Sequence, residues 1–225
     1  MEIKAIAHMR SDFPEKFGIP RQSGLVKELK SRIVFEKEYA NPDAFRGLEG
    51  YSHIWIIWEF SENSGKEWSP TVRPPRLGGN VRRGVFATRS PFRPNGLGLS
   101  CVKLERIEYS EKDGPVLHVS GADLMDGTPI YDIKPYLPLS DCHPEAISGF
   151  AAGTADYCLR VEFPEPLASV FSDEQKTALT GVLAQDPRPS YQHDPDRVYA
   201  MGFAGYDVCF RVDKDLLTVC DVRKM

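Results

Sequence analysis

The segment HIWIIWEF, residues 53–60, is the stretch of this 225-residue chain that most directly indicates its fold. Between its ends the segment is almost wholly apolar, and it has the length of a single strand. Short apolar runs of this kind are typical of strands buried inside a sheet protein. His53 and Trp55 lie in this run, where both residue types are more often part of a core than of a catalytic site, so both roles stay open.

Further extended segments lie on both sides of this run, each bounded by Gly, Pro or Asp turn residues. We expect strands at residues 3–7, 25–35, 84–88, 97–109, 116–123 and 130–133. Before residue 150 the only helix signal is short: Asn41 caps a turn that begins at Pro42 and ends near Leu48. Many strands with few helices predict a mainly β fold with a barrel or sandwich core, rather than βαβ units.

The sequence changes in character after residue 141. From there to the end, 14 acidic residues stand against eight Lys and Arg, and residues 151–154 (AAGT) resemble a linker. Ser172 and Gln175 form a capping-box pattern before an apolar stripe, which predicts a helix. Residues 206–212 and 216–222 predict a hairpin. We therefore expect a first domain over residues 1–145 and a small C-terminal α+β domain over residues 155–225.

Charge is unevenly distributed along the chain. Residues 68–104 contain no Asp or Glu and seven Lys or Arg, although the whole chain has a formal net charge of −4. A basic surface in an acidic protein indicates recognition of an anion. The alternative is a set of flexible, solvated loops, because segments rich in Pro, Gly and Arg are often no more than that.

Several classes of protein lack their usual signatures here. No complete G-x-G-x-x-G, G-x-S-x-G or P-loop motif is present, and the five histidines show no metal-ligand spacing, so we expect no metal. Five cysteines without a CxxC pair argue against a disulfide framework and favour a cytoplasmic protein. No segment has the pattern of an export signal or the length of a membrane span, so we expect no membrane association.

Five short motifs carry a resemblance to a known family. In order they are residues 20–22 (PRQ), 51–55 (YSHIW), 73–79 (RPPRLGG), 83–95 (RGVFATRSPFRPN) and 123–129 (DLMDGTP). Over residues 1 to about 145 the chain resembles the TsaA-like family, whose characterised bacterial members are tRNA threonylcarbamoyladenosine N6-methyltransferases. The resemblance implies a β-barrel unlike the Rossmann methyltransferases, S-adenosylmethionine as methyl donor, a homodimer, and the tRNA anticodon loop as partner.

The resemblance also implies which residues bind the cofactor. Carried over motif by motif, they are Pro20, Arg21, Gln22, Ser61, Glu62, Arg89, Leu99, Asp123, Leu124, Met125, Asp126 and Gly127. The chain departs from the family pattern at two places. Gly96-Leu97 stands where Pro-Ile is usual, and Ser61 stands where a His is usual.

Catalytic and substrate-binding roles follow from the chemistry of the implied reaction. An acylated N6 is a poor nucleophile unless a group accepts its proton, and we assign Asp126 to that role with Arg89 as the group that aligns the reactants. Asp126 precedes Gly127, however, and such a pair is as often a plain turn former. The residues expected to hold RNA are Arg73, Arg76, Arg82, Arg83, Phe92 and Arg93.

Three alternatives stay open from the sequence. Phe92 is as readily explained by packing of its loop as by stacking on a base. The whole chain could be a non-catalytic module that senses S-adenosylmethionine and docks on RNA. The same cofactor could also serve a different acceptor, because the sequence does not fix the acceptor.

Overall fold

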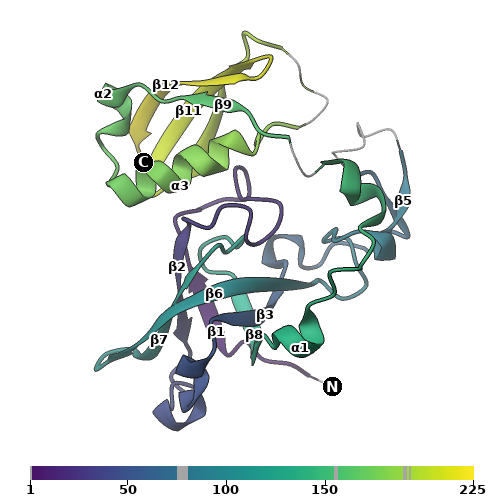
Figure 1. Ribbon diagram of the computed structural model, residues 1–225, viewed down its shortest axis with the longest axis vertical. Helices are drawn as coiled ribbons and strands as arrows, with labels where there is room; N and C mark the ends of the chain where they lie inside the picture. The colour runs from purple at the N-terminus through teal and green to yellow at the C-terminus, as the bar shows by residue number, and fades with distance from the viewer. Residues whose placement is uncertain (1, 75–80, 155–156, 190–191, 193) are drawn as a thin grey trace.

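A closed six-stranded β-barrel forms the first part of the computed structural model, which describes residues 2–74, 81–154, 157–189, 192 and 194–225 (Figure 1). Around the barrel the strands follow the order β1-β2-β7-β6-β3-β8, and β8 pairs with β1 to close it. The strands are β1 (Ala7–Arg10), β2 (Lys30–Phe35), β3 (His53–Glu59), β6 (Leu97–Ser110), β7 (Gly114–Ser120) and β8 (Pro129–Pro135). The predicted mainly β fold with a barrel core is confirmed.

Strand β3 shows why the barrel closes around an apolar interior. Its residues alternate between buried and half-buried, so that Ile54, Ile56 and Trp58 face the core while Trp55 and Ile57 lie on the outer side. The strand pairs with β6 on one side and with β8 on the other. Because both edges are paired, the apolar run predicted as a buried strand has no free edge.

Short elements connect the barrel strands. After β2 come η1 (Pro42–Phe45) and η2 (Leu48–Gly50), and after β3 comes η3 (Ser61–Asn63). The segment that follows contains β4 (Thr71–Val72), β5 (Arg83–Gly84) and η5 (Val85–Ala87), and it projects from the barrel as an arm (Figure 1). Beyond β8 lie α1 (Pro138–Asp141) and η6 (Gly149–Thr154), which lead to the C-terminal part.

Three of the expected strands were wrong in whole or in part. The first begins at Ala7 instead of residue 3, and the second begins at Lys30 instead of residue 25, because Val26 and Leu29 leave the barrel and join another core. The strand expected at residues 84–88 is instead the end of β5 and the 3-10 turn η5. In that turn the Thr88 hydroxyl donates to the Val85 carbonyl at 2.8 Å, which holds the backbone in the tight conformation.

The C-terminal part is a four-stranded sheet with a helix packed against it, as expected for a small α+β domain. Its elements are β9 (Arg160–Glu162), α2 (Glu165–Ala168), α3 (Asp173–Ala184), β10 (Tyr199–Phe203), β11 (Tyr206–Asp213) and β12 (Leu216–Lys224). The sheet order is β10-β11-β12-β9, with β9 parallel to β12. The predicted capping box is present, because the side chains of Ser172 and Gln175 each accept from the other's backbone N–H. The predicted hairpin is β11 and β12.

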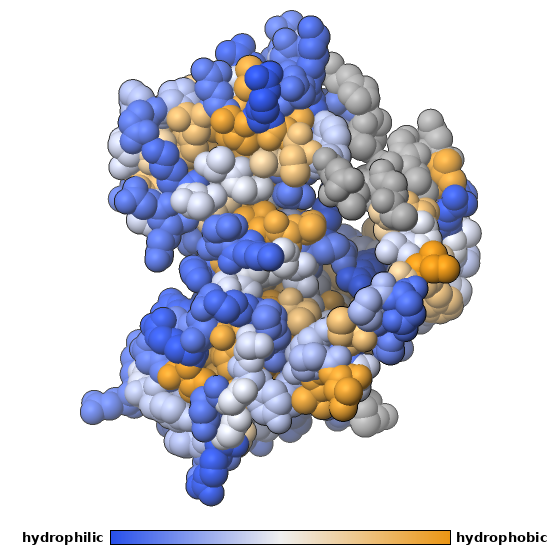
Figure 2. All heavy atoms as spheres, viewed as in Figure 1, coloured by the Kyte–Doolittle hydropathy of each residue, from blue (hydrophilic) through white to orange (hydrophobic). Residues whose placement is uncertain are grey.

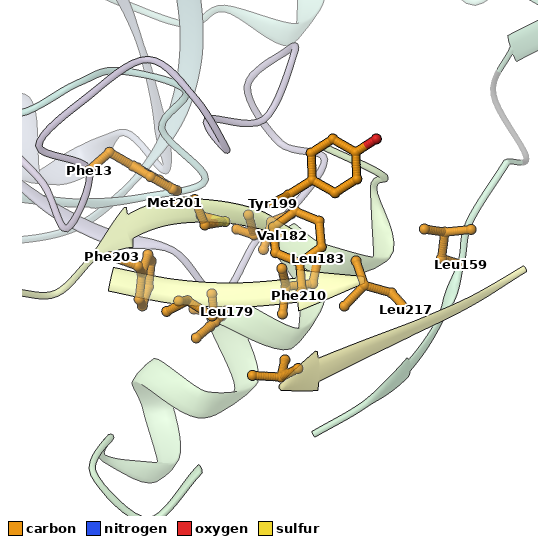
Figure 3. Packing of buried hydrophobic residues seen from close by; sticks show 14 of the residues in the cluster. Phe13, Leu159, Leu179, Val182, Leu183, Tyr199, Met201, Phe203, Phe210 and Leu217 are labelled. Atoms are coloured by element: carbon orange, nitrogen blue, oxygen red, sulfur yellow. The ribbon is translucent and has the colours of Figure 1, made fainter. Parts of the chain in front are cut away.

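The two parts of the molecule share one segment, residues 11–29, which we call the N-terminal loop. It connects β1 to β2, yet Phe13, Val26 and Leu29 are buried in the core of the C-terminal sheet. Figure 3 shows Phe13 pointing from this loop toward Met201 and Phe203 of β10. No helix in the described part of the chain is long and apolar enough to cross a membrane.

Candidate functional site

A cavity of about 470 Å³ lies beside the barrel where four segments meet. Its walls come from the N-terminal loop, the end of β3 with η3, the segment from Thr88 to Leu99, and the turn between β7 and β8. In the same view as the ribbon, the surface is hollowed between the barrel, the C-terminal part and the arm that carries β5 (Figure 2). A cavity of this size lies in the range of small-molecule sites.

Most of the residues assigned to the cofactor line this one cavity. The ten that do so are Pro20, Arg21, Gln22, Ser61, Glu62, Arg89, Leu99, Asp123, Leu124 and Met125. They come from four separate segments of the chain, and only the fold brings them together. Asp126 and Gly127 do not line the cavity.

Asp123 is the carboxylate that the barrel holds most closely. Its Oδ1 accepts from the Ser100 hydroxyl at 2.6 Å, and Ser100 Oγ accepts from Trp58 Nε1 at 3.0 Å. Burial raises the pKa of Asp123 above its ordinary value, against the opposing effects of the Ser100 hydrogen bond, two backbone N–H groups and the Arg89 charge. The result is a carboxylate on the cavity wall that accepts a proton more readily than an exposed one.

Asp126 lies in the turn that follows, where it fixes the backbone. Its Oδ1 accepts from the Ser11 N–H at 3.1 Å, and its Oδ2 lies 3.5 Å from the Arg10 guanidinium. Gly127 has a φ of +77°, and the Thr128 N–H donates to the Met125 carbonyl, which completes a tight turn. These contacts are the ones expected of a turn-forming residue, which is the alternative that the sequence left open for Asp126.

Two polar contacts hold the N-terminal loop against the rest of the cavity wall. Arg89 Nη1 donates to the Gln22 side-chain oxygen, and Lys16 Nζ donates to Asn63 Oδ1 at 3.0 Å. The Ser23 hydroxyl also accepts from the backbone N–H of Cys101, at 3.2 Å. The loop is therefore joined to three neighbouring segments around the cavity.

The sequence reasoning missed several residues of the cavity wall, of which Glu59 is the most informative. Glu59 is the one acidic residue of the apolar run, and it lines the cavity and accepts a hydrogen bond from the Tyr131 hydroxyl. That bond raises the pKa of Tyr131 to about 12, so the phenol stays protonated. A single acid at the end of an otherwise apolar strand was the available signal. Lys16 and Trp58 also line the cavity and stood in no recognised motif.

The arginines expected to hold RNA occupy different settings. Arg73, Arg82 and Arg83 are exposed, and Arg76 lies outside the described residues. Arg93 Nη1 donates to the carbonyls of Val85 at 3.2 Å and Thr88 at 2.6 Å, so one of its nitrogens stabilises the arm.

The aromatic residues of the arm differ in exposure. Phe92 is 40% exposed, whereas Phe86 is 73% exposed and has the Arg93 guanidinium 5.8 Å from its ring centre. Trp68 is 51% exposed. Apolar atoms are visible on this arm in Figure 2. The arm thus carries exposed rings beside positive charge, the combination that suits stacking on unpaired bases.

The two residues of the apolar run with open roles are explained by local contacts. His53 Nδ1 shares a hydrogen bond with the Ser52 hydroxyl at 2.9 Å, and its ring packs near Tyr136. Trp55 donates through Nε1 to Asp141 at 2.9 Å and lines the cavity. Among the residues the structure describes, no group of three or more His, Cys, Asp and Glu side chains could hold a metal.

Comparison with known proteins places the chain among methyltransferases. Residues 8–142 match the model of the tRNA-methyltransferase O N-terminal domain, and residues 156–225 match that of the TrmO C-terminal domain. The chain is 41% identical to the tRNA (adenine(37)-N6)-methyltransferase of Escherichia coli K12, over 94% of this chain and 93% of that protein. It is 38% identical to a Pseudomonas aeruginosa protein named "Putative S-adenosylmethionine-dependent methyltransferase RcsF", over 98% of this chain and 96% of that protein.

The fold is similar as well. A crystal structure of TrmO from Pseudomonas aeruginosa superimposes with a TM-score of 0.79 at 34% identity, and the match covers 99% of this chain and 98% of that chain.

Proposed function

We propose a reaction for this protein on the premise that the chain belongs to the tRNA-methyltransferase O family. Within that family it is an S-adenosylmethionine-dependent methyltransferase of the tRNA (adenine(37)-N6) class. The finer proposal is that its acceptor is the N6 atom of threonylcarbamoyladenosine beside the anticodon. The observation that supports a methyltransferase site is the cavity that collects ten of the assigned cofactor residues around the half-buried carboxylate of Asp123.

The cavity suits S-adenosylmethionine in size and in chemistry. The cofactor carries a carboxylate, a cationic ammonium and sulfonium, ribose hydroxyls and an apolar adenine face. Arg21 and Arg89 offer charges for the carboxylate, and Glu59, Glu62 and Asp123 offer acceptors for the cationic and hydroxyl groups. The apolar side of the wall, formed by Trp58, Phe60, Leu97, Leu99 and Leu124, suits the adenine ring.

The side chains around the cavity position the reactants, and one of them accepts the proton from N6. When bound, S-adenosylmethionine supplies a methyl group on a positively charged sulfur, which leaves as a neutral thioether when a nucleophile takes the methyl. Arg89 is held by Gln22, so its charge has a fixed direction in the cavity. Carboxylates close to the cavity, which the Ser100 and Tyr131 hydroxyls orient, stabilise positive charge there.

Asp123 is the group that we assign as proton acceptor from N6, in preference to Asp126. Asp123 lines the cavity, and burial raises its pKa, which improves it as a base. Asp126 lies off the cavity, engaged with Ser11 and Arg10. With the cofactor bound, Asp123 would take the proton that N6 releases when N6 accepts the methyl group and the methyl–sulfur bond breaks.

We also propose an RNA partner, an oligomeric state and a domain boundary for this chain. The exposed rings and arginines of the arm support contact with the single-stranded anticodon loop. We propose a homodimer as for the family, and the fully exposed Leu139 and Ile147 are candidates for its interface. We place the domain boundary between residues 145 and 155, because the two family models end at residue 142 and begin at residue 156. Cytoplasmic location stays a prediction, with all five cysteines free.

The test combines binding with single-turnover methylation. Wild type should bind S-adenosylmethionine in calorimetry and methylate tRNA that carries threonylcarbamoyladenosine, but not the same tRNA with unmodified adenosine. Asp123→Asn should lose about a hundredfold or more in turnover, the usual scale for a general base. Asp126→Asn is the matched control and should keep most of the rate. Methylation of unmodified adenosine at the same rate would contradict the proposed acceptor, and the reverse order of the two variants would return the role to Asp126.

A further inference from the structure

The N-terminal loop is built into the core of the C-terminal part, although it also forms a wall of the cavity. Phe13 is 1% exposed, and its ring meets that of Phe203 edge to face with centroids 5.4 Å apart. Two hydrogen bonds from backbone N–H groups of the C-terminal part to the loop flank this ring pair. The Ala204 N–H donates to the Asp12 carbonyl at 2.9 Å, and the Gly202 N–H donates to Glu15 Oε1 at 3.1 Å.

Contact with the C-terminal part continues to the cavity itself. Gly18 has a φ of +94°, and a Cβ at this position would lie 2.3 Å from the Met201 side chain. The next residue, Ile19, both packs against the C-terminal core and lines the cavity. Pro20, Arg21 and Gln22 then follow on the cavity wall without an intervening residue.

The far side of the loop returns to the same core before it re-enters the barrel. Val26 is 3% exposed and contacts the helix α3 closely enough that a Cβ on Gly181 would lie 2.9 Å from it. Leu29 is equally buried. The segment that carries Pro20 to Gln22 is thus held at both ends by apolar side chains in a core that belongs mainly to residues 159–219.

We infer that the C-terminal part is a positioning element for the cofactor pocket, which acts through Phe13, Val26 and Leu29 on the loop segment that carries Pro20, Arg21 and Gln22. Outside the C-terminal core, the loop is held by polar contacts, among them Gly24 to Gly121, Ser23 to Cys101, Gln22 to Arg89 and the Phe13 carbonyl to the Asp126 N–H, and none of these buries an apolar side chain of the loop. Without its apolar anchors the loop would sample more conformations, and ligand affinity falls by the fraction of time that the loop spends in the competent one. The identity of the ligand rests on the proposed function, whereas the order of the loop does not.

A pair of matched variants separates this role from general stability. Phe13→Ala and Phe171→Ala remove the same side chain from the same core, and both rings pack against Phe203. Phe171 comes from the C-terminal part and otherwise packs on Phe163 and Tyr206. Both variants are used in the full chain at a temperature where both remain folded.

The first readout is the affinity for S-adenosylmethionine in calorimetry. We expect Phe13→Ala to raise the dissociation constant about tenfold or more, as for a loop that is competent about a tenth of the time. Phe171→Ala should stay within about twofold of wild type, and Phe13→Leu should recover most of the loss. Equal dissociation constants for the two alanine variants would overturn the inference.

The second readout needs no ligand. Amide hydrogen exchange of residues 19–24 should accelerate in Phe13→Ala and not in Phe171→Ala. If Phe13→Ala does not fold, Gly202→Ala replaces it. A Cβ on Gly202 would lie 2.6 Å from Pro14, so this variant disturbs the contact between the loop and β10 from the side of β10. Exchange that is unchanged in the loop variant, or that rises equally in both, would refute the positioning role. If wild type binds no S-adenosylmethionine, the proposed function is refuted instead. The hydrogen-exchange result alone then decides whether the C-terminal part positions the loop.

Discussion

Substitution of Gly98 by Ala should disturb the wall of the cavity, which Gly98 itself lines. Gly98 lies on β6 opposite Trp58 of β3, and a Cβ at this position would lie 2.3 to 2.7 Å from three atoms of the indole ring. Trp58 is only 8% exposed, and the ring of Phe60 packs against it with the two ring centroids 4.4 Å apart. The indole is a rigid plate, so it must move by about 1 Å to reach an ordinary contact distance.

The magnitude follows from two effects of that movement. Overpacking of a core typically costs about 1 to 3 kcal/mol. A shift of this size also breaks the hydrogen bond from Trp58 Nε1 to Ser100, now 3.0 Å, and an unpaired buried donor costs about 1 to 3 kcal/mol more. Together the two effects should lower the free energy of unfolding by about 2 to 6 kcal/mol. Because Ser100 also donates to Asp123, turnover should fall as well.

Urea denaturation followed by tryptophan fluorescence measures the effect, since all three tryptophans precede residue 69 and report on the barrel side of the molecule. Gly96→Ala is the control, because it is the same substitution two residues away with nothing within 4 Å of its added Cβ. The control should match wild type within about 0.5 kcal/mol. A Gly98→Ala protein with wild-type stability and turnover would show that the indole is free to move and that its link to Asp123 has no functional role.

Three further predictions concern other parts of the chain. Arg83→Ala should weaken tRNA binding and lower the slope of log K against log salt by about 0.7, while Lys112→Ala in the turn between β6 and β7 should leave the slope unchanged; equal slopes would exclude a phosphate contact at Arg83. Hydrogen bonds from Ser120, Lys30 and Lys103 lower the pKa of Glu105 to about 2, so its contribution to stability is complete above pH 4.5 and is lost as the pH falls toward 2. The difference in unfolding free energy between wild type and Glu105→Gln should therefore shrink over that interval, and a constant difference would contradict the assignment. Ser172→Ala should cost about 1 kcal/mol through loss of the capping box, measured by thermal unfolding, and no loss would mean that the first turn of α3 is held by packing alone.

The local sequence pattern was sufficient to predict an element where that element is stabilised by its own residues. The apolar run of β3, the long alternation of β6 and the capping box of α3 all lie close to their expected positions. Closure of the barrel was not predictable from periodicity, because it depends on β8 pairing with β1 across more than a hundred residues. That expectation came from the resemblance.

The N-terminal loop shows why the rest of the fold was out of reach. Val26 and Leu29 stand directly before the residues of β2 in one apolar-rich stretch, and nothing local distinguishes a side chain that enters the barrel from one that enters a second core. A similar limit applied at the cavity. The sequence presents Asp123 and Asp126 as two acids of one motif, and only the turn at Gly127 determines which of them faces the cavity.

Because the chain is synthesised from its N-terminus, the N-terminal loop emerges long before the core that buries it. A ribosome that has released residues up to 135 has delivered every strand of the barrel, so the barrel can close while translation continues. The core that buries Phe13, Val26 and Leu29 is formed mainly by α3 and by β10, β11 and β12, which emerge about 40 to 90 residues later. During that interval a nascent chain displays three apolar side chains beside an unfinished cavity. We expect truncated chains that end before β10 to aggregate or to bind chaperones. The N-terminal loop, although it is synthesised early, can therefore be buried only after the last strands have left the ribosome.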